Sequence, residues 1–212
     1  MWSVADIADA LIDGLARAEA RLTEEHAIYG LDALDELGLH PVIEQAFREA
    51  GFGVHREQRY PADRILARFS EGQRCDFVLT PDGCGLREPD RPPTLFDPPD
   101  AVPLDEAFWL EIKTARQFTT DGPNPRYTTE MLSVSRADVS KLSRDRHILH
   151  AGLGLAAFVE DQRVADNDLS VWYERAVARG LPIGFPSMRL TPITNRLGNG
   201  LCAIAICPVN HL

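Results

Sequence analysis

The sequence predicts an α/β fold, in which a mixed central sheet is flanked by helices and preceded by an N-terminal helical extension. Segments such as 74–79 and 108–114 are short, largely apolar runs that each carry an acid, as expected of strands. Segments such as 3–21 and 167–179 repeat their apolar residues with a helical period. The order is helices, three strands, helix, strand, helix and strands, which is typical of a sheet with helices on both faces. The 212 residues are enough for one domain with a core.

Composition narrows the class of protein. Apolar residues make up 44% of the chain, as in ordinary globular proteins. No stretch reaches the apolar length of a membrane span, and the N-terminus lacks a basic region followed by an apolar one, so we expect a cytoplasmic protein without a membrane partner. The cysteines form no CxxC pair, which favours buried reduced thiols over a zinc site; they are Cys75, Cys84, Cys202 and Cys207.

Charge is distributed unevenly. The net charge of −10 disfavours a nucleic-acid partner. However, residues 1–50 hold eleven acids against three arginines, whereas 55–75 hold five arginines against three acids and 136–150 hold four cations against two acids. The middle of the chain is therefore expected to present a basic surface between acidic ends. The alternative is an acidic protein whose arginines only solvate one face.

Three helical stretches are expected before the first strand. Ser3 and Asp6 form a capping box for a helix to Arg21, and 23–38 predict a second helical stretch, either continuous or broken near Gly30. Pro41 suits the first turn of a third helix, which runs to about Ala50 and stops at Gly51. Glu44 lies near the edge of the buried stripe of this helix, where it is either a solvated acid or a functional one.

Three strands and a long insertion follow. Residues 52–60 predict a first strand with Val54 inward, and 64–69 are either a short strand or a turn of helix. The strand 74–79 ends at a turn signature, Thr80-Pro81-Asp82-Gly83. Residues 81–107 separate it from the next strand, and 81–103 contain seven prolines. This segment is interpreted as a surface insertion, either a recognition loop or a disordered one.

The C-terminal half alternates helices and strands. After a polar loop over 115–127, Ser135 and Asp138 form a capping box for a helix to about His150. The remaining expected elements are a buried strand over 153–159, a helix over 167–179 that Gly180 ends, and a last strand over 201–207 with its antiparallel neighbour within 185–200.

The strand 108–114 carries the chemistry. Glu111 and Lys113 are two residues apart, so their side chains share one face with Trp109. If the strand 74–79 pairs with it, Asp76 converges on Glu111, and two carboxylates beside a lysine suit a hard cation. The chain has only two lysines, Lys113 and Lys141, which indicates that position 113 requires an ammonium group. The plainer interpretation is a surface strand with a weak exposed ion pair.

A helix with a glutamate, a strand with Asp76 and a strand with Glu111-Ile112-Lys113 together resemble the PD-(D/E)xK nuclease superfamily. The resemblance covers roughly residues 40–160 and implies a restriction-endonuclease-like domain over 39–212, with 1–38 as the helical extension packed on it. It implies that Asp76, Glu111 and the carbonyl of Ile112 bind Mg²⁺, or Mn²⁺ in its place. Lys113 would orient or help deprotonate the attacking water and stabilise the charge that develops on phosphorus.

Further positions carry over with less support from the sequence. Glu44 matches a helical acid that many members place near the metal, and Gln117 matches a glutamine of some branches. The residue before Asp76 is Cys75, where the motif has proline, and a literal Pro81-Asp82 pair lies in a turn. Asp76 is preferred because it lies inside an apolar strand, where it can align with Glu111.

The resulting hypothesis is a Mg²⁺-dependent endonuclease that hydrolyses DNA in restriction, defence or repair. Phosphate contacts are expected from Arg74, Lys141 and Arg144. One alternative is a catalytically weak, nuclease-like module that binds DNA or a protein partner, the latter through the acidic N-terminal helices. Another, favoured only by the charge of −10, is an enzyme or subunit that does not bind nucleic acid. A homodimer fits double-strand cleavage.

Overall fold

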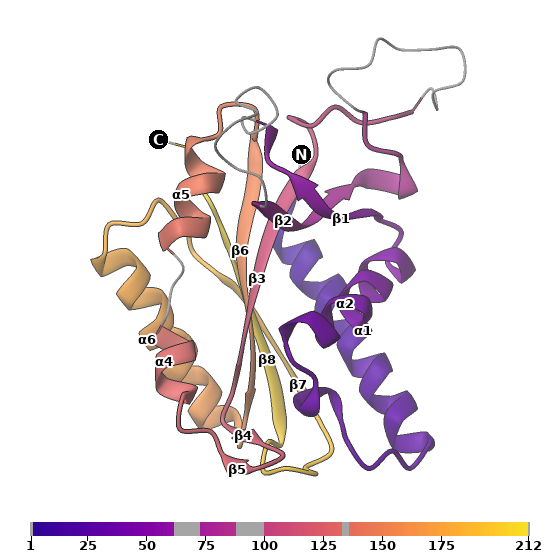
Figure 1. The fold of residues 1–212 in the computed structure, drawn as a ribbon, viewed down its shortest axis with the longest axis vertical. Coiled ribbons are helices and arrows are strands. Elements are labelled where there is room, and N and C mark those ends of the chain that lie inside the picture. Colours follow the sequence, from indigo (N-terminus) through magenta and orange to yellow (C-terminus); the bar gives the residue numbers. More distant parts are fainter. Residues whose placement is uncertain (1, 62–72, 88–99, 133–135, 212) are drawn as a thin grey trace.

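The computed structural model describes the chain except residues 1, 62–72, 88–99, 133–135 and 212. In this described part, six strands form one mixed sheet in the order β1-β2-β3-β6-β8-β7, with helices on both faces (Figure 1). The α/β prediction is therefore confirmed. The strands are β1 (Gly53–Arg59), β2 (Arg74–Thr80), β3 (Phe108–Arg116), β6 (His150–Val159), β7 (Ser187–Pro192) and β8 (Leu201–Pro208).

Two N-terminal helices cover one face of the sheet, α1 (Val4–Glu24) and α2 (Glu36–Glu49) (Figure 1). The predicted cap of α1 is confirmed, because the Ser3 hydroxyl accepts from the backbone N–H of Asp6. The two helices approach closely at Gly14, where an added Cβ would lie 2.0 Å from the Cβ of Ala46. The core on this face joins α1 and α2 to Phe77, Leu110 and Ile204, among others.

The stretch between these helices differs from the prediction. Residues 23–38 do not form a second helix; they contain one short 3₁₀ helix, η1 (Leu31–Ala33), before α2 starts. Asp35 caps α2 by accepting from the N–H of Gly38 at 2.7 Å, so the helix begins before Pro41 and not at it. Pro41 consequently lies inside α2, where it has no N–H to donate to the preceding turn.

The opposite face carries α4 (Tyr127–Leu132), α5 (Arg136–Arg144) and α6 (Gln162–Ala178) (Figure 1). The short hairpin of β4 (Phe118–Thr119) and β5 (Gly122–Pro123) lies where a polar loop was expected, and α4 begins at the end of that segment. Helix α5 ends at Arg144 because β6 already begins at His150. Helix α6 starts earlier than expected, because Asp161 caps it by accepting from the N–H of Val164. The expected cap at residue 135 and the element at 64–69 lie outside the described residues.

The insertion over 81–107 is described only at its two ends. A short 3₁₀ helix, η2 (Pro81–Gly83), follows β2, and Leu86 bridges Val102 in parallel. The segment thus leaves and returns at neighbouring places beside the sheet. None of the helices in the described ranges combines the length and the apolar character needed to cross a membrane.

Pairing within the sheet is uneven. Strands β3 and β6 are parallel and paired from Phe108–His150 to Arg116–Phe158. Strands β2 and β3 are antiparallel and paired only from Leu79–Phe108 to Phe77–Leu110. Continuing this register by one residue would place Asp76 opposite Glu111, and there the two strands separate. We call this place, formed by Asp76, Glu111 and Ile112, the β2–β3 fork.

Candidate metal centre at the fork

The fork brings a carboxylate to an open strand edge. Asp76 Oδ2 accepts a hydrogen bond of 2.9 Å from the backbone N–H of Ile112, in the place where a partner strand would supply a carbonyl. The N–H and C=O of one strand residue point to the same lateral side. The carbonyl of Ile112 therefore also faces the fork. The three groups that were predicted to bind a metal belong to one local arrangement.

Backbone irregularities create this arrangement. Strands β1 and β2 pair at Arg56–Phe77 and again at Gln58–Cys75, but the intervening pair of Glu57 and Asp76 is missing. Glu57 has a φ of 52°, which costs a non-glycine residue roughly 1–3 kcal/mol. Glu57, Asp76 and Glu111 thus form one row across three neighbouring strands, with the regular ladder interrupted on both sides of Asp76.

Glu111 is a buried carboxyl group. Its side chain is on a residue only 3% exposed, and the Tyr60 hydroxyl, directly after β1, donates a hydrogen bond to it. Burial is the main reason that the pKa of Glu111 is raised, to about 9, and the charge of Asp76 and a side-chain hydrogen bond with Asp76 raise it further. Two carboxyl groups that share a hydrogen bond cannot both ionise without a large cost in free energy, unless a cation compensates their charges. The fork is therefore chemically suited to a cation with oxygen ligands.

Asp138 organises the lysines beside the fork. The Nζ atom of Lys113 lies 3.5 Å from Asp138 Oδ2 and 3.5 Å from Glu36 Oε1. Lys141 donates to Asp138 Oδ1 at 3.1 Å, and its Nζ lies 5.7 Å from the centroid of the Tyr60 ring. Burial is the largest single influence and lowers the pKa of Lys113, but the charges of Glu36, Asp138, Asp76 and Glu111 together raise it more, so the net shift is upward. Lys113 is consequently an ammonium ion in this arrangement.

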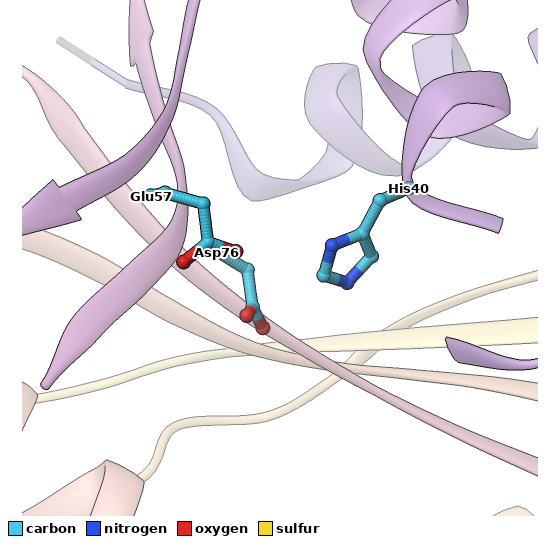
Figure 2. A group of neighbouring side chains, drawn as sticks. All are labelled: His40, Glu57 and Asp76. Atoms are coloured by element: carbon cyan, nitrogen blue, oxygen red, sulfur yellow. The ribbon is translucent and has the colours of Figure 1, made fainter. Parts of the chain in front are cut away.

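A second group of ligand atoms shares Asp76. His40 in α2, Glu57 in β1 and Asp76 in β2 each offer an atom, and these atoms lie within 4.8 Å of one another. Figure 2 shows the imidazole of His40 directed from its helix toward the two carboxylates. His40 is 1% exposed, its ring meets the Phe77 ring edge-on at 5.1 Å, and neither ring nitrogen has a hydrogen-bond partner among the described residues. An unmade hydrogen bond of this kind costs about 1–3 kcal/mol.

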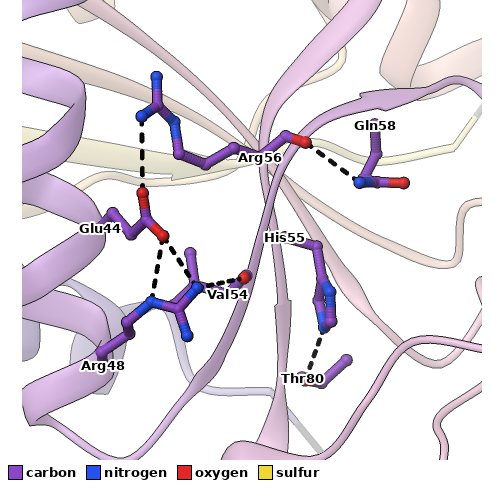
Figure 3. A network of polar contacts seen from close by, with 7 residues as sticks. All are labelled: Glu44, Arg48, Val54, His55, Arg56, Gln58 and Thr80. Carbon is purple, nitrogen blue, oxygen red and sulfur yellow. Dashed lines mark hydrogen bonds and ion pairs between the residues drawn. The ribbon is translucent and has the colours of Figure 1, made fainter.

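Two of the predicted site residues do not join either group. The carboxylate of Glu44 is held by Arg48 at 2.8 Å and by Arg56 at 3.5 Å (Figure 3). Gln117 lies beyond the end of β3, where its Oε1 accepts from the N–H of Glu160 at 2.9 Å. The helical residue that approaches Asp76 is His40, which lies one turn before Glu44, so the structure replaces the expected acid with a histidine.

The predicted phosphate-binding residues differ in exposure and in their contacts. Arg74 is exposed and donates from Nη1 to the backbone carbonyl of Glu57 at 2.8 Å, close to the second group. Lys141 is half-buried, and Arg144 is exposed at the end of α5. A role for these cations in binding DNA stays a prediction. Two further arginines of the expected basic surface, at positions 64 and 68, lie outside the described residues.

Several residues at the fork were not predicted from the sequence: Glu36, His40, Glu57, Tyr60 and Asp138. Asp138 was assigned only to a helix cap, and Tyr60 only to a strand end. A signal existed for His40, because residues four apart in a helix share a face and His40 lies four before Glu44. No comparable local signal marks Glu57, since glutamate is not a residue that favours positive φ.

Comparison with known proteins does not identify the chain. No family model, no curated protein and no solved structure gives a match. The features that bear on function are therefore chemical ones at the fork: two converging carboxyl groups, a strand edge whose Ile112 N–H is bound by Asp76 and not by a partner strand, and an ammonium ion beside them.

Proposed function

We propose that this protein is a divalent-metal-dependent endonuclease with a restriction-endonuclease-like fold, which hydrolyses phosphodiester bonds in DNA. The observation that carries the proposal is the convergence of Asp76 and Glu111 at the fork, with Lys113 on the same strand two residues beyond Glu111. Asp76, Glu111 and the carbonyl of Ile112 would hold Mg²⁺ or Mn²⁺. The donors are all oxygen atoms, which is what Mg²⁺ prefers.

The cation, when bound, would activate water and compensate charge on the phosphate. The chain's own groups have separate tasks. The Tyr60 hydroxyl orients Glu111, and the N–H of Ile112 orients Asp76. Lys113 is suited to stabilise negative charge on the scissile phosphate, because it is a compact ammonium ion beside the carboxyl groups.

Asp138 is a positioning residue in this proposal. It contacts both lysines of the chain, so it fixes the ammonium of Lys113 relative to the fork and links it to α5. Lys113 would release one of its present contacts, to Glu36 or Asp138, to contact a phosphate. The upward shift of its pKa favours this charge-stabilising role over the removal of a proton from water.

The alternative is a nuclease-like binding module with little turnover. The net charge of −10 does not separate this module from a nuclease where both bind DNA, because DNA repels either acidic protein at long range. The cations proposed to contact DNA phosphates are Arg74, Lys141 and Arg144. A homodimer, or a protein partner on the acidic N-terminal helices, is compatible with either function and stays a prediction.

A cleavage assay tests the proposal. The full chain is incubated with supercoiled plasmid and with labelled oligonucleotides while Mg²⁺ or Mn²⁺ is titrated, and EDTA is the metal-free control. We expect metal-dependent nicking or cutting that Asp76→Asn and Glu111→Gln each reduce at least about a hundredfold, the scale of losing a group that stabilises the transition state. High Mg²⁺ should partly restore Glu111→Gln, because that variant keeps Asp76 and Ile112.

The matched control is Glu44→Gln, which changes an acid of α2 that lies outside the fork. Glu44 is occupied by Arg48 and Arg56, so cleavage should remain within about twofold of the unmodified chain. Absence of cleavage under all metal conditions, with DNA binding retained, would contradict the nuclease proposal and support the binding module. Cleavage that Asp76→Asn leaves unchanged would place the active site elsewhere.

A further inference from the structure

We propose a second metal site in this protein, formed by His40, Glu57 and Asp76, which binds a divalent first-row transition metal such as Mn²⁺. Its ligand atoms come from three elements, α2, β1 and β2, and lie within 4.8 Å of one another. Asp76 faces both this site and the fork, so its two carboxylate oxygens would serve two neighbouring cations. This arrangement is independent of the residues Glu111 and Lys113.

The strongest sign of a ligand is the state of His40. A histidine this deeply buried normally donates or accepts at least one hydrogen bond, but both nitrogens of His40 lack a partner among the described residues. Its ring is directed toward Glu57 and Asp76 (Figure 2). A cation bound to one ring nitrogen would satisfy that atom and compensate the two carboxylates.

The backbone is built to bring Glu57 to this place. Its φ of 52° interrupts the β1–β2 ladder opposite Asp76. This conformation is strained for a glutamate, and strain of this kind is concentrated at functional sites. One turn along α2, Glu44 pairs with Arg48 and Arg56, and Arg48 also donates to the carbonyl of Val54 at 3.2 Å (Figure 3). These contacts fix α2 against β1 and thereby hold His40 against Glu57.

The donor set selects the class of cation. Two carboxylates and one imidazole suit Mn²⁺, Fe²⁺, Co²⁺ or Zn²⁺, whereas Mg²⁺ and Ca²⁺ prefer oxygen ligands alone. Metal binding here does not depend on nuclease activity. A contribution of this cation to cleavage does rest on the proposed function, because it would act through the Asp76 shared with the fork.

Pulsed electron paramagnetic resonance of the full chain with Mn²⁺ tests the site. Electron spin echo envelope modulation detects a nitrogen directly bound to Mn²⁺. We expect ¹⁴N modulation in the unmodified chain, its loss in His40→Phe, and its retention in His55→Gln, the matched control on β1. Glu57→Gln should weaken Mn²⁺ binding at least about tenfold, since even outer contacts of a metal site contribute that much.

The outcomes separate this inference from the proposed function. Nitrogen modulation that persists in His40→Phe, or is absent from the unmodified chain, overturns the second site; the latter result needs no variant to fold. Glu111→Gln should keep the modulation while losing cleavage, because Glu111 belongs only to the fork. Modulation that depends on His40 in a chain without nuclease activity would leave the metal site standing and reject the nuclease proposal.

Discussion

The two halves of the sheet are built differently. In the half formed by β6, β8 and β7, pairing between β6 and β8 continues without interruption from Gly152–Pro208 to Val159–Leu201, and apolar side chains fill both faces. In the half formed by β1, β2 and β3, the ladder breaks on both sides of Asp76, next to the buried carboxyl group of Glu111. The difference indicates that the half with β6, β8 and β7 supplies stability, whereas the half with β1, β2 and β3 contains strained backbone.

The largest expected effect concerns the regular half. Ile204 in β8 is fully buried, so Ile204→Ala should lower the free energy of unfolding by about 2–5 kcal/mol through lost burial and a cavity. Denaturant titration measures it, and cleavage at temperatures where the variant stays folded should be retained. A loss below about 1 kcal/mol would show that β8 is not the stabilising half.

Lys113→Arg tests the irregular half. We expect the variant to fold and bind DNA but to cleave at least about a hundredfold more slowly, because a planar guanidinium cannot take the place of a compact ammonium between Glu36 and Asp138. Single-turnover cleavage and a binding assay separate the two effects, and added Mg²⁺ should not restore the rate. Arg189→Lys in the regular half is the control. Near-normal cleavage by Lys113→Arg would show that position 113 needs only a positive charge and not an ammonium group.

A pH titration sharpens the comparison further. The pKa of Glu111 is raised by burial and by Asp76, so folding favours its protonated form. In the metal-free chain, stability from this group is therefore full below its unfolded pKa near 4.5 and is lost as pH rises toward about 9, with a slope of at most about 1.4 kcal/mol per pH unit.

Glu111→Gln should remove that slope and leave the metal-free variant more stable than the unmodified chain at alkaline pH. Thermal unfolding with EDTA across this pH range measures the difference. If both chains lose stability in parallel, Glu111 is not a strained acid, and the contrast between the halves loses its main evidence.

The smallest effect is expected at the Glu44 contacts. The side chains of Glu44 and its arginine partners are partly exposed, so Glu44→Gln should change the free energy of unfolding by less than about 1 kcal/mol. Because these contacts align α2 with β1, the same variant should weaken Mn²⁺ binding only slightly compared with Glu57→Gln. A larger loss of stability would show that the contacts of α2 with β1 stabilise the fold, contrary to the contrast drawn between the two halves of the sheet.

Elements with strong local signals could be predicted from the sequence. The Ser3 cap placed the start of α1. Side chains of β3 alternate between the two faces of the sheet, so Trp109 packs in one core and Leu110 and Ile112 pack in the other. The α/β class follows from such patterns because burial imposes a regular period on each element.

The remainder depends on tertiary contacts that no local pattern encodes. Pro41 suggested a helix start, but the cap at Asp35 acts earlier in the chain. The approach of His40 to Asp76 requires α2 to lie across the β1–β2 ladder, and the positive φ of Glu57 runs against the preference of glutamate. At the candidate site, the sequence identified Asp76 and Glu111, which lie in apolar strands, and missed the helical residue His40 and the positive-φ residue Glu57.

The most direct test of the central claim is anomalous X-ray diffraction from crystals of the full chain grown with Mn²⁺. We expect an anomalous peak at the fork, within about 2–2.5 Å of carboxylate oxygens of both Asp76 and Glu111 and near the carbonyl of Ile112. Data from an Asp76→Asn crystal should lack this peak. A Mn²⁺-saturated crystal with no peak at the fork, or with Asp76 turned away from Glu111, would show that these two carboxyl groups do not form a metal site.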